Sequence, residues 1–303
     1  MGKINFGAIL TEKNNPATKR IDQVPIRKAL ELINREDAKV AAAVKKEIPK
    51  MEDAVRQMVD SIKKGGRLFF LGAGTSGRLG VMEAAECPPT FNTPPYLVQA
   101  FMAGGRNSVF RSKEGAEDRG QDARTLINRK VHNKDVLIGV AASGVTPFVR
   151  EGLQAARRKG SFTILITCHA KIPRNAAHII ISPRTGPEVI AGSTRLKAAT
   201  ATKLILNSLT VATMIQLGKV FGNRMVDLQP KSKKLKARAE RLIQELGKVS
   251  PQRAASLLKN SGGNAKTAVL MARKNISKEV AQALLKITDG RLSKAIALKE
   301  IKF

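Results

Sequence analysis

Cysteine, histidine and the large aromatic residues are scarce in this sequence. Two cysteines, three histidines, one tyrosine and no tryptophan occur among 303 residues. The cysteines give neither a disulfide framework nor a zinc-binding spacing, and the histidines are scattered, so we expect no metal site. Because aromatic residues make up only 4% of the chain, few of them could stack on single-stranded nucleic acid.

Long apolar runs are missing as well. No run approaches the roughly 20 residues of a membrane span, and the N-terminus lacks the apolar stretch of a secretory signal. We therefore predict a cytoplasmic protein with no membrane partner. An apolar content of 43% over 303 residues is enough for a full core, and this length favours one large domain with a smaller one.

Acidic residues are also few: 24 Asp and Glu stand against 54 Lys and Arg, a net charge of +30. Such an excess suggests nucleic acid as one candidate partner. The basic residues are not gathered into one arm, however, because residues 231–303 hold 18 of them and residues 1–230 hold the other 36. We favour solvated basic surfaces and expect no specific nucleic-acid partner.

Short apolar segments alternate with helical patterns between residues 67 and 230. Most of the segments are nearly continuous apolar runs, as in a parallel sheet that is covered on both faces. They are Leu68–Leu71, Tyr96–Ala100, Val136–Ala141, Phe162–Thr167 and His178–Ile181. The helical patterns between and after them are Ser76–Ala85, Lys113–Lys130, Pro147–Arg158 and Arg195–Gly218. This alternation predicts an α/β fold with a doubly wound, mainly parallel five-stranded sheet between helices.

Helical regions flank this α/β domain on both sides. Residues 1–66 predict a helical N-terminal arm, with helical patterns at Pro25–Glu36, Asp37–Ile48 and Met51–Lys64. Residues 231–303 hold short helical patterns separated by Ser, Gly and Pro, which is typical of a small helical bundle. The predicted domains are therefore 1–66, 67–230 and 231–303.

The segment from Arg67 to Pro89 carries the clearest functional signal. An apolar strand runs into a loop of glycines and hydroxyls, residues 72–77 with the sequence GAGTSG, and this loop opens a helix. Free backbone N–H groups, hydroxyl donors and the positive end of a helix together bind anions. Residues 142–147 and 192–194 repeat this arrangement at the same predicted edge of the sheet. We therefore predict a phosphate-binding site formed by these loops.

Other phosphate motifs fit less well. Residues 72–77 lack the Gly-Lys-Ser/Thr ending of a Walker A loop. Their glycine spacing matches the dinucleotide fingerprint, but hydroxyls stand where a pyrophosphate needs close backbone approach, and no acidic residue ends the second strand. A sugar phosphate is favoured over a dinucleotide.

Acidic residues near these loops are candidates for acid and base chemistry. They are Glu83 and Glu86 on the first helix, and Glu114, Glu117 and Asp118 at the head of the next predicted helix. In so basic a chain, ion pairing is the alternative interpretation for each of them. Glu86 precedes Cys-Pro-Pro, so we expect it at the end of its helix, where a partly desolvated carboxyl could act as a general acid.

Long motifs in this chain resemble those of the N-acetylmuramic acid 6-phosphate etherases. These are bacterial sugar isomerase (SIS) domain proteins related to the glucokinase regulatory protein. The matching segments are LGAGTSGRLGVMEAAECPPTF, EGAEDRGQDA, ASG-TPF and GPEVIAGSTRLKAATATKLILNSL with GKVFGNRMVDL. The opening TEKNNPATKRID and the basic C-terminal bundle also resemble the family's N-terminus and its small, UBA-like helical tail, so the resemblance spans nearly the whole chain.

The resemblance implies a carbon–oxygen lyase. Members of this family cleave the lactyl ether at C3 of N-acetylmuramate 6-phosphate, giving N-acetylglucosamine 6-phosphate and D-lactate in cell-wall amino sugar recycling. The reaction is an elimination across C2–C3 of the open-chain sugar followed by addition of water, without metal or organic cofactor. By motif, Glu86 would protonate the departing lactate oxygen and then activate water. Glu117 would take the C2 proton, with Glu114 as the alternative.

The resemblance and the loop pattern also define an expected binding site and assembly. The residues predicted to bind the anionic amino sugar phosphate are Gly74, Thr75, Ser76, Ser143, Gly144, Thr146, Ser193 and Lys197. A homodimer is expected, and Glu83 is then interpreted as a structural or ion-paired residue. At position 145, where this chain has Val145, the family usually has Arg. At position 199, where this chain has Ala199, the family usually has Gly. The first change could remove a cation near the substrate, and the second could narrow the pocket by a methyl group.

Two alternative functions stay open on the same fold. One is a non-catalytic sugar-phosphate-binding regulator like the glucokinase regulatory protein, although that protein carries two tandem SIS domains and this chain is long enough for one. The other is an aldose–ketose sugar-phosphate isomerase, against which the family motifs around Glu86 argue.

Overall fold

A computed structural model describes residues 12–169, 172–227, 230 and 232–298. The chain divides into two compact units. One consists of Met1–Ala85 with Pro95–Thr210, and the other of Glu86–Pro94 with Val211–Phe303. Each unit is described by itself below, and the predicted division into 1–66, 67–230 and 231–303 stays a prediction.

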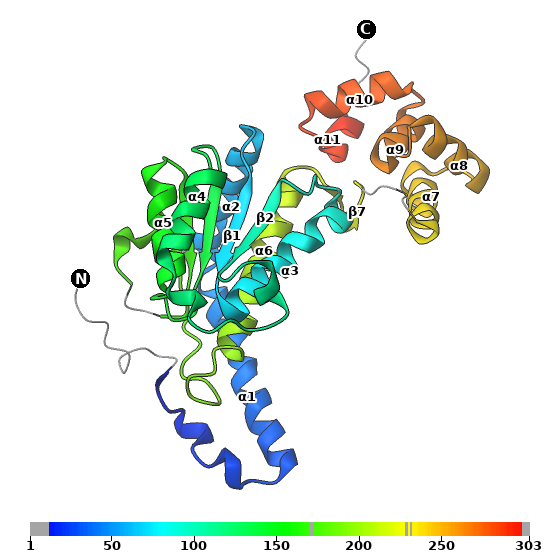
Figure 1. The fold of residues 1–303 in the computed structure, drawn as a ribbon. Coiled ribbons are helices and arrows are strands. Elements are labelled where there is room, and N and C mark those ends of the chain that lie inside the picture. Colours follow the sequence, from blue (N-terminus) through cyan, green and yellow to red (C-terminus); the bar gives the residue numbers. More distant parts are fainter. Residues whose placement is uncertain (1–11, 170–171, 228–229, 231, 299–303) are drawn as a thin grey trace. The chain divides into compact units, whose positions relative to one another are not determined.

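The first unit is built on a sheet of five parallel strands (Figure 1). They are β1 (Leu68–Gly72), β2 (Val98–Met102), β3 (Val136–Val140), β4 (Phe162–Ile166) and β5 (Ile179–Ile181), in the order β2-β1-β3-β4-β5. The predicted α/β fold is thereby confirmed. Because the chain steps from β1 to β2 on one side and then returns to β3 on the other, the sheet has a switch point between β1 and β3.

Helices cover both faces of this sheet. Alternate residues of β1 pack in opposite directions, because its side chains point to the two faces in turn. Helix α5 (Pro147–Arg158) approaches Leu71 so closely that a methyl group on Gly152 would lie 2.2 Å from it. Helix α3 (Gly74–Phe91) approaches Phe70 on the other face at Gly80, at 2.8 Å.

The remaining helices of this unit complete the two layers. Helix α4 (Gly120–Lys130) packs beside α5, and α2 (Ile48–Lys63) packs against β5. Helix α6 (Lys197–Gln216) begins in this unit and ends in the other. By length and composition α6 could cross a membrane, a test that buried core helices also pass, and half of its apolar window is buried inside the fold.

The N-terminal part has one long helix where the sequence predicts two. Helix α1 (Ile26–Lys45) runs unbroken through the expected boundary between Glu36 and Asp37. No glycine or proline stands there to stop it, and Glu36 is buried within it. Two short 3-10 helices precede α1, namely η3 (Pro16–Thr18) and η4 (Ile21–Gln23).

Two further predicted boundaries are wrong. Helix α3 starts at Gly74, within the predicted loop, and continues through Pro88 and Pro89 to Phe91 instead of ending at Ala85. The predicted helix over 113–130 is not one element: Gly115, at φ +70°, separates residues 113 and 114 from η6 (Ala116–Asp118), and Arg119, at φ −80° and ψ 65°, separates η6 from α4. Other short 3-10 helices are η5 (Arg106–Val109) and η7 (Arg174–Ala176).

Five helices form a bundle in the second unit. They are α7 (Lys233–Gly247), α8 (Pro251–Asn260), α9 (Ala265–Lys274), α10 (Lys278–Ile287) and α11 (Leu292–Ala297). Side chains of Ser232, Ser250, Asn264 and Ser277 cap the first four by accepting a backbone N–H three residues on. The short antiparallel strands β6 (Val220–Phe221) and β7 (Arg224–Met225) precede the bundle.

A buried lysine connects the bundle to the segment before it. The ammonium of Lys266 donates to the carbonyls of Gly218 (3.1 Å) and Gly290 (3.2 Å) and to Asp227 (3.2 Å). Lys266 is only 7% exposed, and burial lowers its pKa although Asp227 opposes this effect. One side chain therefore satisfies acceptors from three separate parts of the second unit.

Replacement of Lys266 by Met should destabilise this unit. The two carbonyls would lose this donor while staying largely buried, and Asp227 would keep only one of its two lysine partners, Lys219. We expect this to lower the free energy of unfolding by about 2–4 kcal/mol. Urea denaturation followed by circular dichroism measures the change. Lys259→Met, at an exposed position of α8, is the matched control and should differ little from the wild type. Equal stabilities of the two variants would contradict the role of Lys266.

Candidate functional site

The loop between β1 and α3 is shaped by two glycines in contact. A methyl group on Gly77 would lie 2.7 Å from the carbonyl oxygen of Gly72, and one on Gly72 would lie 2.7 Å from the nitrogen of Gly77. This approach lets α3 start two residues after β1 ends. Thr75 and Ser76 therefore lie in the first turn of α3, where backbone N–H groups have no helical acceptor and the helix dipole is positive.

The loop between β3 and α5 provides the second group of donors. Gly144, at φ +72°, turns the chain so that its N–H donates to Ala141, and the hydroxyl of Ser143 accepts the N–H of Val145 at 3.4 Å. Thr146 is the N-cap residue of α5, yet its side chain makes no capping hydrogen bond. Its hydroxyl is thus left for another partner at the positive end of α5.

These two loops line one cavity of about 320 Å³. Of the predicted site residues, the structure brings together five from the loops, and it adds Glu117 from η6. The predicted residues in the lining are Gly74, Thr75, Ser76, Ser143, Thr146 and Glu117. Glu12, Asp118 and Val145 line it too, as do Gly192 and Thr194, the neighbours of Ser193. We call this space the cradle cavity.

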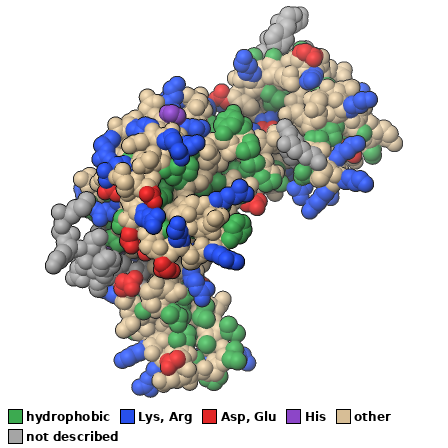
Figure 2. Space-filling view, in the orientation of Figure 1, with side chains coloured by type: hydrophobic (Ala, Val, Ile, Leu, Met, Phe, Trp, Pro, Cys, Tyr) green, Lys and Arg blue, Asp and Glu red, His purple; other side chains and the backbone are tan. Residues whose placement is uncertain are grey.

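The charge of the cradle cavity is unexpected in so basic a chain. Among its described lining residues, three carry carboxyl groups, namely Glu12, Glu117 and Asp118, and none is a lysine or arginine. Figure 2 shows Lys and Arg side chains spread over the visible faces of the molecule. Any anion bound in the cradle cavity would therefore depend on neutral N–H and O–H donors in its lining.

Four of the predicted residues do not line the cradle cavity. Gly144 and Ser193 shape its loops, and the N–H of Ser193 donates to Ile190 at 3.0 Å. Lys197 is 1% exposed, and its ammonium lies 2.6 Å from Glu36. Glu86 is exposed on α3 and falls in the second unit. The expectation that Glu86 stands at a helix end is wrong, because α3 continues for five more residues.

The other acidic candidates are also located. Glu83 is buried and accepts hydrogen bonds from Asn207 and Thr210 of α6, which supports its structural interpretation. Glu114 is exposed in the turn before η6. It lines a second cavity, which shares Ala73, Gly74 and Glu117 with the cradle cavity. It does not lie one helical turn before Glu117, because the helix expected there is absent.

A buried ionic network, which sequence reasoning missed, holds the third loop. Glu36 of α1 accepts hydrogen bonds from Lys197, from Lys39 and from Asn15. Burial raises the pKa of Glu36, but these three donors outweigh it and bring the pKa to about 2. Asn15 also donates to the carbonyl of Pro187 at 3.3 Å, so the N-terminal segment is connected to the loop that carries Gly192 and Thr194.

A second buried carboxyl fixes the start of α6. Glu188 is 1% exposed and accepts the N–H groups of Lys197 and Ala198, both at 2.9 Å. Burial raises the pKa of Glu188, although the two N–H donors act against it. A polar residue nine or ten positions before the groups it caps gives no local sequence signal, because capping motifs are recognised over three or four residues.

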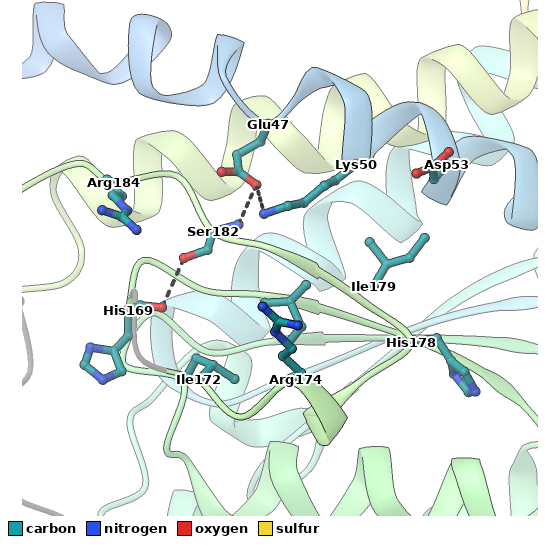
Figure 3. A pocket seen from close by; sticks show the side chains of 11 residues that line it. Glu47, Lys50, Asp53, His169, Ile172, Arg174, His178, Ile179, Ser182 and Arg184 are labelled. Atoms are coloured by element: carbon teal, nitrogen blue, oxygen red, sulfur yellow. Dashed lines mark hydrogen bonds and ion pairs between the residues drawn. The ribbon is translucent and has the colours of Figure 1, made fainter.

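A different cavity, of about 620 Å³, lies along the edge strand β5 (Figure 3). Glu47 accepts the N–H of Ser182 at 3.0 Å and lies 2.9 Å from the ammonium of Lys50. Arg174 and Arg184 also line this cavity. None of the predicted site residues lines it.

Comparison with known proteins places the chain among named relatives. It is 44% identical over 291 residues to an N-acetylmuramic acid 6-phosphate etherase from Rhodopirellula baltica, covering 95% of this chain and 96% of that protein. It is 45% identical to the protein of the same name from Trichormus variabilis, covering 96% and 95%. Residues 50–157 match the family model of the glucokinase regulatory protein N-terminal SIS domain.

A solved structure shares the fold. A provisionally named phosphosugar isomerase, from Bacteroides fragilis, superposes with a TM-score of 0.50 at 18% identity, over 66% of this chain and 95% of that one. At this identity the likeness concerns the fold alone.

Substitution of Glu36 should change how stability depends on pH. A carboxyl whose pKa falls from its ordinary 4.5 to about 2 on folding stabilises the fold above pH 4.5, and this contribution is lost as the pH falls towards 2. Glu36→Gln should therefore remove up to about 3 kcal/mol of the loss in unfolding free energy between pH 5 and pH 2. Denaturant titrations across this pH range measure the effect.

The matched control is Glu52→Gln, an exposed residue of the neighbouring helix that pairs with Arg56. Its pH dependence should follow the wild type. A Glu36→Gln protein with the wild-type slope would show that the network around Lys197 does not hold Glu36 ionised.

Proposed function

Because this chain belongs to the N-acetylmuramic acid 6-phosphate etherase family, we propose that it cleaves the lactyl ether of N-acetylmuramic acid 6-phosphate. The products would be N-acetylglucosamine 6-phosphate and D-lactate. Identity of 44% over 95% of the chain supports this assignment. The single structural observation that carries it is that Glu117 lines the same cavity as the donors of two strand-end loops.

The proposed enzyme is a carbon–oxygen lyase of amino sugar recycling, active in the cytoplasm and without a metal or cofactor. The described residues offer no cluster of three or more His, Cys, Asp or Glu side chains able to hold a metal ion. The chemistry we propose needs only proton transfers and hydrogen bonds, which the side chains of the cradle cavity can supply.

The phosphate would occupy the cradle cavity. Ser76, Ser143 and Thr146 would donate their hydroxyls to its oxygens, together with N–H groups at the starts of α3 and α5. These donors are fixed by rigid elements, so they can hold the sugar at a constant distance from Glu117. Gly144 and Ser193 would contribute through loop geometry, and Lys197 through its contact with Glu36 rather than by touching the sugar.

Two carboxyl groups would move the protons. Ionised Glu117 would take the proton from C2, which the C1 aldehyde of the open-chain sugar acidifies. Protonated Glu86 would give a proton to the lactyl oxygen as the C3–O bond breaks, so that the electron pair of the C2–H bond forms the C2=C3 double bond. Glu86 would then activate the water that adds to C3, and Glu117 would return its proton to C2. The assignment of Glu86 rests on its family motif.

Two substitutions distinguish the site from the usual family pattern. Val145 lines the cradle cavity at the position where the family usually has Arg. Ala199 is half-buried in the first turn of α6. Neither removes a carboxyl group or a hydroxyl that the proposed reaction uses, and no observation here favours the regulator or the isomerase instead.

Substitution of each glutamate tests the chemistry. Glu86→Gln and Glu117→Gln should each lower the rate of D-lactate release from N-acetylmuramic acid 6-phosphate by at least about 10²-fold, because each loses a proton-transfer group. Both should still bind N-acetylglucosamine 6-phosphate, since the hydroxyl donors remain. Reaction of the wild type in H₂¹⁸O should place the label at C3.

Glu114→Gln is the matched control, because Glu114 is the alternative to Glu117. It should keep D-lactate release within a few-fold of the wild type. A larger loss in Glu114→Gln than in Glu117→Gln would exchange their roles. No D-lactate from folded wild-type protein would overturn the proposed function.

The expected homodimer has a candidate surface on α1. Ile26 and Leu30 are 81% and 60% exposed, and residues four apart lie on the same side of a helix. We propose that a second copy covers this pair. Leu30→Glu should then convert the dimer to a monomer in sedimentation velocity experiments, whereas Lys28→Glu, an exposed position on the opposite side of α1, should not. A wild-type monomer at micromolar concentration would contradict the proposal.

A further inference from the structure

A second, smaller cavity adjoins the cradle cavity. It has a volume of about 140 Å³, several times the roughly 30 Å³ that one water occupies in the liquid. The two cavities share Ala73, Gly74 and Glu117 in their linings. We call the smaller one the arginine cavity, because Arg78 of α3 lines it. Its other polar side chains are those of Ser108, Ser112, Lys113 and Glu114, besides the shared Glu117.

Arg78 is held by neutral groups only. Its Nε donates to the carbonyl of Val109 at 2.8 Å, and its Nη2 donates to the carbonyl of Ser108 at 3.0 Å and the hydroxyl of Ser112 at 3.2 Å. No carboxyl group of the described residues forms an ion pair with it. The guanidinium is thus fixed while its charge is not neutralised, and its Nη1 keeps two N–H donors for another acceptor.

Ser108 adds a second, independent sign of a missing partner. It is 3% exposed, and its hydroxyl has no hydrogen-bond partner within the described structure. A buried hydroxyl without a partner costs free energy, so such groups normally meet a ligand or water. Ser108 and Arg78 both line the arginine cavity.

The substrate of the proposed reaction carries a group that needs such a site. Its lactyl carboxylate would lie beside C2 and C3, and therefore close to Glu117, which repels it. The cradle cavity offers no cation within its described lining, and Val145 stands where the family usually has Arg. A carboxylate near Glu117 can be stabilised from the arginine cavity, where a fixed guanidinium and a hydroxyl are donors.

We propose that the arginine cavity binds the lactyl carboxylate of the substrate, with Arg78 and Ser108 as its donors and Lys113 as a second cation. This assignment rests on the proposed function. It divides the substrate between two sites: neutral donors hold the phosphate, and the fixed guanidinium of Arg78 holds the carboxylate. The pocket then distinguishes a lactyl ether from the same sugar phosphate without one.

Comparison of two sugars tests the proposal, since N-acetylglucosamine 6-phosphate lacks only the lactyl group. Ser108→Ala and Lys113→Met are mild changes that should leave the fold intact, and Arg78→Met removes the fixed cation. We expect the Michaelis constant for N-acetylmuramic acid 6-phosphate to rise about 10- to 100-fold in Arg78→Met and about three- to tenfold in the other two. Binding of N-acetylglucosamine 6-phosphate should stay within twofold of the wild type in all three.

Arg111→Met, an exposed cation on the same segment that lines neither cavity, is the matched control and should leave both quantities unchanged. Equal weakening of the two sugars, or no change for either, would overturn the carboxylate site. A fall in kcat with an unchanged Michaelis constant would also overturn it, because the residues would then act on the reaction rather than on binding. Release of D-lactate by the wild type is scored separately, so failure of the proposed function is distinguishable.

Discussion

The contact between Gly72 and Gly77 is the constraint on which the candidate site depends. Only residues without a side chain allow β1 to end and α3 to begin within two residues. The tight turn points the N–H groups at the start of α3 towards the loop that follows β3. The strand order places that loop next to it, because β1 and β3 are neighbours and their last residues, Gly72 and Val140, lie in register. A larger side chain at either glycine would separate strand from helix.

The proposed substrate would be bound by two kinds of hydrogen-bond donor, neutral hydroxyl and amide groups in one cavity and a guanidinium in the other. A phosphate with two negative charges would meet hydroxyl and amide groups, and the described lining of the cradle cavity places no lysine or arginine beside Glu117. This matters because a lysine beside Glu117 would compete with the C2 proton for the carboxylate. The cation is instead Arg78, which lines the adjoining arginine cavity. Three neutral acceptors hold its guanidinium in place. The high net charge of the chain therefore contributes little to the site itself.

The sequence predicted most of the fold because its signals are local. Apolar runs mark the five strands, and the glycine and hydroxyl loops after β1 and β3 are readable without knowledge of distant residues. Predictions failed where a boundary is decided by packing. Two consecutive prolines did not end α3 at Ala85, and non-helical backbone at Gly115 and Arg119 interrupts the helix that the periodicity favoured.

The parts of the site that could not be predicted depend on contacts across the chain. The sequence predicts Lys197 as a ligand for the anion. In the structure its ammonium forms an ion pair with Glu36, which lies 161 residues earlier in the chain. Arg78 and Ser108 belong to segments about 30 residues apart, and nothing near either one signals a shared cavity. The position of Glu86 on an exposed part of α3 likewise follows from the length of that helix, which no local pattern revealed.

The Glu36–Lys197 pair has a consequence for biosynthesis. A ribosome adding about 5–20 residues per second needs roughly 8–30 s to extend the chain from one member of the pair to the other. During that interval Glu36 lacks its Lys197 partner, and until residues 187–189 are made the side chains of Asn15 and Thr18 lack the carbonyls of Pro187 and Val189 to which they donate. These contacts of the N-terminal segment therefore form only after the loop that follows β5 and the start of α6 have been synthesised.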